Sequence, residues 1–270
     1  TTPLPGTAEG IRMQVTFLGT GSAMPTGERM QTGLLVDSEG DAGPLLVDCG
    51  SGALHSLAAT EVGYEGVDTV LLTHHHLDHV SDLMPLMKAR WLAGAESLRV
   101  VGPPGTGDLV EGLLDVHDYM QDRLDLRLRE VTPDEAPFDL AGYSVDAMET
   151  VHSMYCHAYR FGTVGGGDDG PTFTFSGDSE ATDRLARFAD GSDALVHDCS
   201  FPDAVDVDNH PTPTALGRAL ADADADLGRI YLTHLYPHTE GVQEEMLDSL
   251  TEQYDGDVRF ASDGLTVEIG

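Results

Sequence analysis

Five of the six side chains in His74-His-His-Leu-Asp-His79 can bind a metal ion. The segment directly follows an apolar run, so it places nitrogen and oxygen donors at the end of a predicted buried strand. Because alternate side chains of an extended chain share one side, His74 and His76 can bind the same ion while His75 points away. Asp78 and His79 follow where the chain must turn, and they can bind a second ion. The spacing predicts a metal-dependent hydrolase, and a histidine-rich surface loop without an ion is the alternative.

Further donors for such a site lie just beyond three other predicted strands. His152 follows residues 143–149 and Asp178 follows residues 172–176, whose apolar positions alternate as in half-buried strands. His234 follows the short apolar segment 229–233. Each residue alone would more often be structural than a ligand. Their repeated position after a strand indicates that these segments contribute to one site.

The order of these donors resembles the metallo-β-lactamase superfamily, whose fold is a four-layer αββα sandwich of the α/β class. Within this superfamily, the chain resembles the ribonuclease Z branch over nearly its whole length. The segments that carry this closer resemblance are Phe17–Thr26, Val47–Gly50, Gly102–Thr106, Ser176–Asp178 and Leu232–His234.

Carried over to this chain, the resemblance implies a centre with two divalent metal ions. The implied ligands are His74, His76 and His152 for one ion, Asp78, His79 and His234 for the other, and Asp178 as a bridge between them. Imidazole and carboxylate donors without thiolate suit Zn²⁺, and Mn²⁺ is compatible with them. Two such ions lower the pKa of a bound water and stabilise charge on a phosphoryl or carbonyl oxygen.

Two further segments are similar to catalytic parts of that branch. The family's His-Glu-Ala-Thr segment is similar to His197–Ser200, and its His-Ser-Thr segment is similar to His210–Thr212. The resemblance implies that Asp198 orients His210 and that His210 protonates the leaving group. The candidate catalytic residues are therefore Asp198 and His210, together with the implied metal ligand Asp78. A carboxylate that holds an imidazole fixes its tautomer and raises its basicity, which makes it a usable acid near neutral pH. Alternatively, His210 only caps a helix that begins just after it.

The chain departs from the ribonuclease Z pattern in the parts that handle RNA. Those enzymes generally carry an extruded basic arm that binds tRNA, commonly between the residues equivalent to His152 and Asp178. Only residues 153–177 lie in this interval here, and they are predicted to form a hairpin around Gly165–Gly170. The loop Pro25–Met30 also lacks the family's Lys and Asn. We therefore expect metal chemistry without the arm, and we do not expect tRNA 3′ processing.

The chain is strongly acidic, with 47 Asp and Glu residues against 14 Lys and Arg residues and a formal net charge of −33. The acidic residues are dispersed, and a hydrophobic content of 40% is too high for a disordered chain. This pattern is typical of a haloarchaeal or other halophilic source, where the Debye length falls to about 3 Å at 1 M salt. RNA stays a candidate substrate, although no basic stripe marks an interface for it.

The predicted elements repeat one plan in both halves of the chain. Strands are predicted at 12–18, 33–36, 44–48 and 69–73, helices at 52–59, 81–93 and 106–119, and later helices at 181–189, 212–223 and 242–250. In the second half, strands are predicted to lead to His152, Asp178, Asp198 and His234. Because the donors are dispersed over both halves, we expect one domain spanning residues 1–270.

Cysteine usage and hydropathy indicate a cytoplasmic protein. The three cysteines lack C-x-x-C spacing, which suits a reducing compartment. No apolar run approaches the roughly 20 residues needed to cross a bilayer, and no basic-then-apolar leader begins the chain. We expect no membrane partner, and the resemblance implies a homodimer.

The leading functional hypothesis is a binuclear metal-dependent hydrolase that resembles ribonuclease Z and acts on RNA or a small phosphodiester. One alternative is a hydrolase of small esters, lactones or sulfates. The other is a metal-binding paralogue with a binding or regulatory role.

Overall fold

The computed structural model describes residues 12–38, 40, 42–164, 170–205 and 207–270. Over these residues the chain forms two mixed sheets of seven strands each. The first sheet has the order β14 (Thr266–Ile269), β1 (Met13–Gly19), β2 (Gly33–Ser38), β3 (Leu45–Val47), β4 (Thr69–Leu71), β5 (Ser97–Gly102), β6 (Asp125–Glu130). The second has the order β13 (Val258–Phe260), β12 (Arg229–Thr233), β11 (Ala194–Asp198), β10 (Thr172–Phe175), β9 (His157–Thr163), β8 (Tyr143–Glu149), β7 (Phe138–Leu140).

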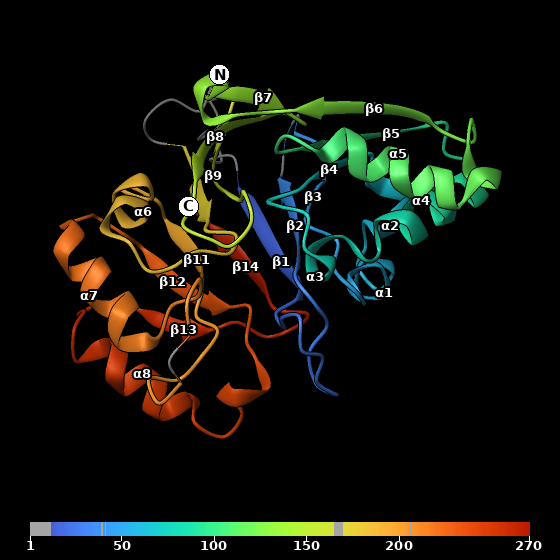
Figure 1. Cartoon of the computed structure of the whole chain (residues 1–270). Helices are drawn as coiled ribbons and strands as arrows, with labels where there is room; N and C mark the ends of the chain where they lie inside the picture. Colours follow the sequence, from blue (N-terminus) through green and yellow to red (C-terminus); the bar gives the residue numbers. More distant parts are fainter. Residues whose placement is uncertain (1–11, 39, 41, 165–169, 206) are drawn as a thin grey trace, which may run out of the picture.

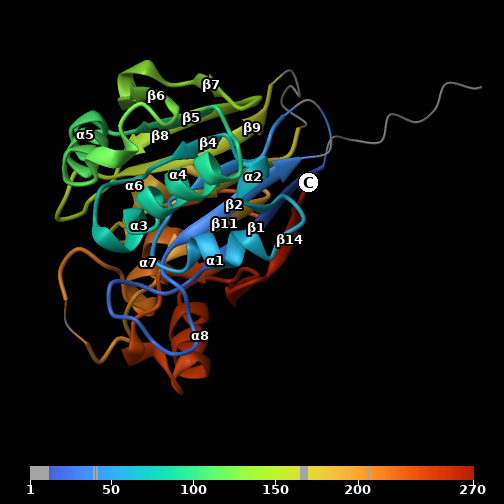
Figure 2. The same cartoon turned by 90° about the vertical axis from the view of Figure 1, so that its right-hand side faces the viewer.

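Helices cover the outer face of each sheet, so the molecule has four layers (Figure 1). The helices over the first sheet are α1 (Ala53–Ala58), α2 (Gly63–Gly66), α3 (Leu77–Val80), α4 (Leu83–Leu92) and α5 (Thr106–Val116). The helices over the second sheet are α6 (Asp183–Phe188), α7 (Pro213–Ala223) and α8 (Gln243–Thr251). Short 3₁₀ turns lie at η1 (Asp118–Met120), η2 (Pro133–Glu135) and η4 (Pro237–Thr239). Figure 2 shows α1, α2 and α4 in front of the first sheet.

Three apolar cores separate the four layers. Strand β1 shows the reason, because Val15 and Phe17 point into the core between the sheets while Leu18 points to the core under the first helical layer. A third core lies between the second sheet and α6 to α8. Strands buried on both faces can carry apolar side chains at every position, as the run Leu45–Val47 does. The predicted four-layer αββα sandwich is therefore confirmed.

The sheet topology brings the strand ends that carry donors to one edge of the sandwich. Strands β3 to β6 run parallel to one another, and so do β10 to β13. In each half, antiparallel pairings precede the parallel strands, from β1 to β3 in the first and from β7 to β10 in the second. Because the carboxyl ends of parallel strands meet at one edge, residues that follow β4, β10 and β12 can converge there.

Most predicted elements form within two or three residues of their expected bounds. The predicted helix at 81–93 begins at Leu83, because Asp82 accepts the N–H groups of Gly52 and Leu54 and so caps α1 instead. The predicted helix at 106–119 ends at Val116 and continues as η1. Strands β5, β7, β13 and β14 were not predicted.

Some predictions concern segments outside the described residues. Strands β9 and β10 pair antiparallel, as the hairpin prediction requires, but its loop at 165–169 lies outside them. Residues 1–11 of the predicted domain also lie outside the described residues. The assignment of residues 1–270 to one domain stays a prediction. Within the described chain, no helix combines the length and apolar character needed to cross a bilayer.

Candidate metal centre

The loop after β4 directs its alternate histidines as the spacing predicts. Nε2 of His74 lies 3.0 Å from Nδ1 of His76, so these two side chains face the same space. His75 points away, and its Nε2 lies 2.9 Å from the hydroxyl of Thr106 at the start of α5. The short helix α3 then turns the chain, which buries both Asp78 and His79.

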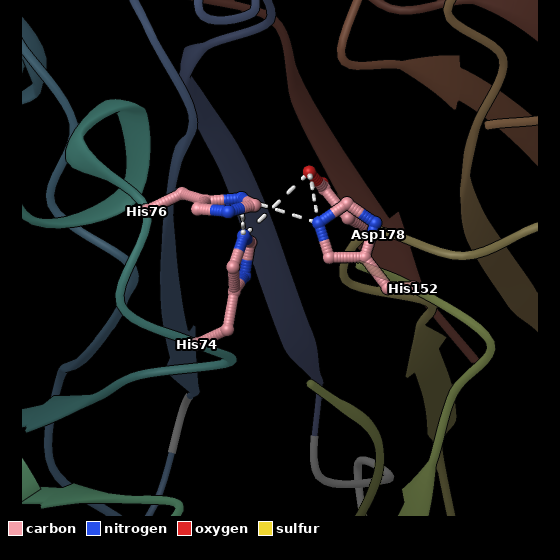
Figure 3. Close-up of side chains that lie close together, drawn as sticks. All are labelled: His74, His76, His152 and Asp178. Carbon is pink, nitrogen blue, oxygen red and sulfur yellow. Dashed lines mark hydrogen bonds and ion pairs between the residues drawn. The ribbon is translucent and has the colours of Figure 1, made fainter. Parts of the chain in front are cut away.

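The first donor group consists of His74, His76, His152 and Asp178, with one donor atom of each within 4.8 Å of the others. Figure 3 shows the first two on one loop and the other two facing them from separate segments. Nε2 of His152 lies 3.2 Å from Nδ1 of His76. One oxygen of Asp178 lies 3.7 Å from His74 and 3.8 Å from His152. Residues 104 positions apart therefore converge on one point.

The second donor group consists of Asp78, His79 and His234, all buried. Nε2 of His234 lies 3.1 Å from Oδ2 of Asp78 and 3.3 Å from Oδ2 of Asp178. Nε2 of His79 lies 3.3 Å from the other oxygen of Asp178. The carboxylate of Asp178 thus contacts both groups. The structure brings together all seven residues that the sequence nominated as ligands, in the same two sets.

The ionisation of the first donor group suits metal binding. Burial lowers the pKa of His74 well below its ordinary value and also lowers the pKa values of His76 and His152, so these imidazoles are neutral at pH 7. Burial alone would raise the pKa of Asp178, but the imidazoles of His234 and His79 hold it well below its usual range. Neutral imidazoles and a carboxylate are the forms that bind divalent ions. In the second group, nearby carboxylates act against burial and raise the pKa of His79 well above its ordinary value and also the pKa of His234, so an ion bound there would displace protons from these rings.

Contacts within the two groups fit a pair of cations. Nε2 of His79 is buried and has no hydrogen-bond partner among the described residues. In the first group, two imidazole nitrogens approach Nδ1 of His76 within 3.2 Å, although one lone pair can accept only one N–H well. A cation between these atoms would satisfy the lone pairs together. The residues present therefore fit the two implied ions, and the donor set suits Zn²⁺ or Mn²⁺ alike.

Asp48 contacts His79 of the second donor group, although the sequence assigned it no role. Its Oδ2 lies 2.8 Å from Nδ1 of His79, and its carboxylate also accepts the N–H and the hydroxyl of Thr73. A sequence signal for this role was present, because Asp48 follows the buried strand β3 just as the ligands follow their strands. Its contact with His79 arises only from the pairing of β3 with β4.

The predicted relay residues are in contact. Oδ2 of Asp198, at the end of β11, lies 2.7 Å from Nδ1 of His210. Although burial acts in the opposite direction, Asp198 raises the pKa of His210 to about 9. The capping alternative for His210 is wrong, because α7 begins at Pro213 and Thr212 occupies its N-cap position.

Gly177, directly before Asp178, lets the backbone pass close to strand β9. Its φ is +56°, and a Cβ there would lie 2.7 Å from the carbonyl oxygen of His157 and 3.0 Å from Sγ of Cys156. A side chain at this position would therefore clash with strand β9. This close approach holds the segment before Asp178 tightly against the neighbouring strand.

The two donor groups open into a cavity of about 440 Å³. His76, His152, Asp178 and His210 line it, together with Leu77 and Tyr236. Among the described residues that line it there is neither Lys nor Arg. Positive charge for an anionic group of a ligand would therefore come from bound metal ions and from His210.

Two mixed sheets between helical layers, with His and Asp donors clustered at the carboxyl ends of their strands, define a metallo-β-lactamase-fold protein. Residues 13–245 match the family model described as "Anti-Pycsar protein Apyc1", and the chain belongs to this family.

Full-length relatives agree with this fold. The chain is 28% identical to a ribonuclease Z from Halorubrum lacusprofundi, over 96% of this chain and 98% of the relative. It is 30% identical to a ribonuclease Z from Mycobacterium bovis, over 95% and 98%. The crystal structure of YhfI, a metallo-β-lactamase-fold protein from Bacillus subtilis, matches with a TM-score of 0.78 and 27% identity, over 95% of this chain and 99% of that one. The predicted resemblance to the ribonuclease Z branch is confirmed.

Proposed function

We propose that this protein is a binuclear metal-dependent phosphodiesterase that acts on small phosphodiesters, with cyclic nucleotides as the substrate class. The observation that carries the proposal is the clustering of the seven donors beside the Asp198–His210 pair, with a cavity that members of both donor groups and His210 line. The family match supports the substrate class, because cyclic nucleotide phosphodiesterase is the activity associated with Apyc1.

The two ions, when bound, supply an activated water and stabilise charge on the phosphoryl oxygens. The first and the second donor group would each hold one ion, and the carboxylate of Asp178 contacts both groups. Because the ligands follow several different strands of the two sheets, the fold positions them before substrate enters, which is what orientation-dependent catalysis requires.

His210 supplies the proton that the leaving group needs. With its pKa raised to about 9 by Asp198, against the effect of burial, the ring is an imidazolium at neutral pH. Nδ1 donates to Asp198, so Nε2 on the other side of the ring is available to a leaving oxygen in the cavity. A positioned acid of this kind contributes roughly 10²- to 10⁴-fold to the rate.

The cavity favours a small organic diester over a long RNA. Leu77 is 76% exposed at its rim, and Tyr236, whose ring stacks on Phe201 at 4.3 Å, forms another wall. These surfaces suit an apolar or aromatic group such as a nucleoside. The described part of the 153–177 interval is the β9–β10 hairpin, which offers no basic arm for tRNA.

Parallel assays of the metal-loaded protein in molar KCl would test the proposal. The substrates would be 3′,5′-cyclic nucleotides, bis(p-nitrophenyl) phosphate, a precursor tRNA, and aryl ester and aryl sulfate. We expect turnover of the diesters, with His210→Ala reducing kcat on cyclic nucleotides by about 10² or more. Turnover of the ester or sulfate but of neither small diester would refute the proposal, and 3′ cleavage of the precursor tRNA would show that the arm is dispensable.

A further inference from the structure

Ser200, which has no role in the function proposed above, lies between the relay and the metal ligands. Its hydroxyl oxygen is fully buried and lies 2.6 Å from Oδ1 of Asp198 and 2.9 Å from Nδ1 of His234. The same oxygen lies 2.9 Å from the carbonyl oxygen of His234 and 3.4 Å from Nδ1 of His210. One hydroxyl therefore contacts a residue of the relay and a residue of the second donor group.

The single hydrogen and the lone pairs of this hydroxyl limit the hydrogen bonds that it can make. A serine has one hydrogen to donate and lone pairs that accept. When Nε2 of His234 binds an ion, Nδ1 carries the ring hydrogen and donates it to Ser200. The serine hydrogen then goes to Oδ1 of Asp198, which is closer than the carbonyl oxygen and carries charge. The other oxygen of Asp198 stays free to accept from His210 at 2.7 Å.

We propose that Ser200 is a positioning residue that fixes the ring of His234 for metal binding and the carboxylate of Asp198 for the proton relay. The metal-binding half holds for any reaction at this centre. The relay half rests on the proposed phosphodiesterase function. Without the hydroxyl, the carboxylate of Asp198 could not replace it as the acceptor, because its Oδ1 lies 3.8 Å from Nδ1 of His234, which is too long for a hydrogen bond.

Four proteins would separate positioning from general stability: the parent, Ser200→Ala, Ser200→Thr and Ser192→Ala. Threonine keeps the hydroxyl. Ser192 is a matched control, because its buried hydroxyl lies 2.8 Å from that of Thr174 but precedes β11, at the opposite end from Asp198. The control therefore loses a comparable buried hydrogen bond far from the site.

Calorimetric titration of the metal-free proteins with Zn²⁺ and with Mn²⁺ tests the metal-binding half without an activity readout. Loss of a partner that orients a metal-binding histidine typically weakens affinity about 10- to 100-fold, which we expect of Ser200→Ala for one of the two ions. Ser200→Thr should recover most of that affinity, and Ser192→Ala should bind both ions as the parent does. Parent-like affinities in Ser200→Ala would overturn this half.

Kinetics at saturating metal test the relay half through the leaving group. A cyclic nucleotide expels an alkoxide that needs protonation, whereas bis(p-nitrophenyl) phosphate expels a stable phenolate. Ser200→Ala should lower kcat about tenfold or more on the former and much less on the latter, with small changes in KM, and Ser200→Thr should restore it. An equal loss on both substrates, or none, would overturn the relay half. A parent protein that cleaves neither diester would instead refute the proposed function, and the metal titration would then decide the role of Ser200.

Discussion

Oδ2 of Asp48 lies 2.8 Å from Nδ1 of His79, and both side chains are completely buried. Because this contact fixes the hydrogen on Nδ1, the lone pair of Nε2 faces the second donor group. Asp48 also accepts two hydrogen bonds from Thr73, so each of its oxygens serves as an acceptor. The carboxylate thereby joins the loop that carries the first ligands to the helix that carries the second.

Replacing Asp48 with Asn should weaken metal binding. The amide group places a donor where the native carboxylate accepts, so either His79 or Thr73 loses its partner. We expect metal affinity to fall about 10- to 100-fold, and the free energy of unfolding to fall by about 1–3 kcal/mol. Metal titration and urea unfolding would measure both. Asp82→Asn is the control, because Asp82 accepts two backbone N–H groups of α1 and should affect stability alone.

Replacing Asp178 with Ala should remove or disorder the metal centre, because its carboxylate contacts both donor groups. We expect fewer than two ions per chain by elemental analysis, and activity on the diesters reduced by about 10² or more. Asp139→Asn, an exposed change on β7, is the control. A variant with full metal content and full activity would show that Asp178 does not bridge the ions.

Asn209 should tolerate Gly but not Val. Its carbonyl oxygen lies 3.2 Å from Nδ1 of His152, and its φ is +71°, in the left-handed region. A β-branched residue is strained there, by about 1–2 kcal/mol or more, and relief of that strain would move the carbonyl away from the ligand. We expect weaker binding of one ion in Asn209→Val and parent-like binding in Asn209→Gly. Equal affinities in the two variants would contradict this backbone role.

His157 should make the fold sensitive to acid. Burial lowers its pKa to about 4 from the ordinary 6.5, and its Nε2 has no hydrogen-bond partner in the part of the chain that the structure describes. Above pH 6.5 the ring is neutral in both states and contributes no pH dependence. Between pH 6.5 and 4 the unfolded chain binds a proton that the folded chain does not, so stability falls as pH falls, by about 3 kcal/mol in total.

The variant His157→Leu should lose this part of the acid sensitivity. Urea unfolding at pH 7 and at pH 4.5 in the same molar KCl would give the stability loss of each protein, and the comparison removes contributions from other groups. We expect the variant to lose about 2–3 kcal/mol less than the parent over this range. An equal loss of stability in both proteins would show that protonation of His157 does not contribute to the acid sensitivity of the fold.

Salt should stabilise the fold, because a net charge of −33 repels itself strongly when it is unscreened. Raising KCl from 0.2 M to 3 M reduces the Debye length to below about 3 Å. A gain of about 2 kcal/mol in the free energy of unfolding would raise Tm by about 4–8 °C, which circular dichroism can measure. Sucrose is the control for KCl, because it stabilises proteins through its exclusion from their surface and does not screen charge. A Tm that falls or stays constant with KCl would argue against adaptation to high salt.

Local sequence patterns determined much of the fold and the donors. Alternating and continuous apolar runs indicated the strands before His74, His152, Asp178 and His234, because burial of one or both faces dictates such patterns. The relay pair Asp198 and His210 came from family resemblance, and the structure places the two side chains in contact. The short edge strand β14 was missed, since it pairs with β1 across most of the chain and carries little local signal.

The tertiary structure alone decided which residues hold the donors in place. Asp48, Ser200 and Asn209 contact His79, His234 and His152 across 31, 34 and 57 residues. Such contacts depend on strand order and on left-handed turns, and neither can be read from the spacing of a motif. The sequence by itself indicated metal-binding chemistry, because the donor types and spacing of the segment from His74 to His79 are local. The orientation of each ligand is a property of the folded sandwich, because parallel strands bring distant residues to one edge.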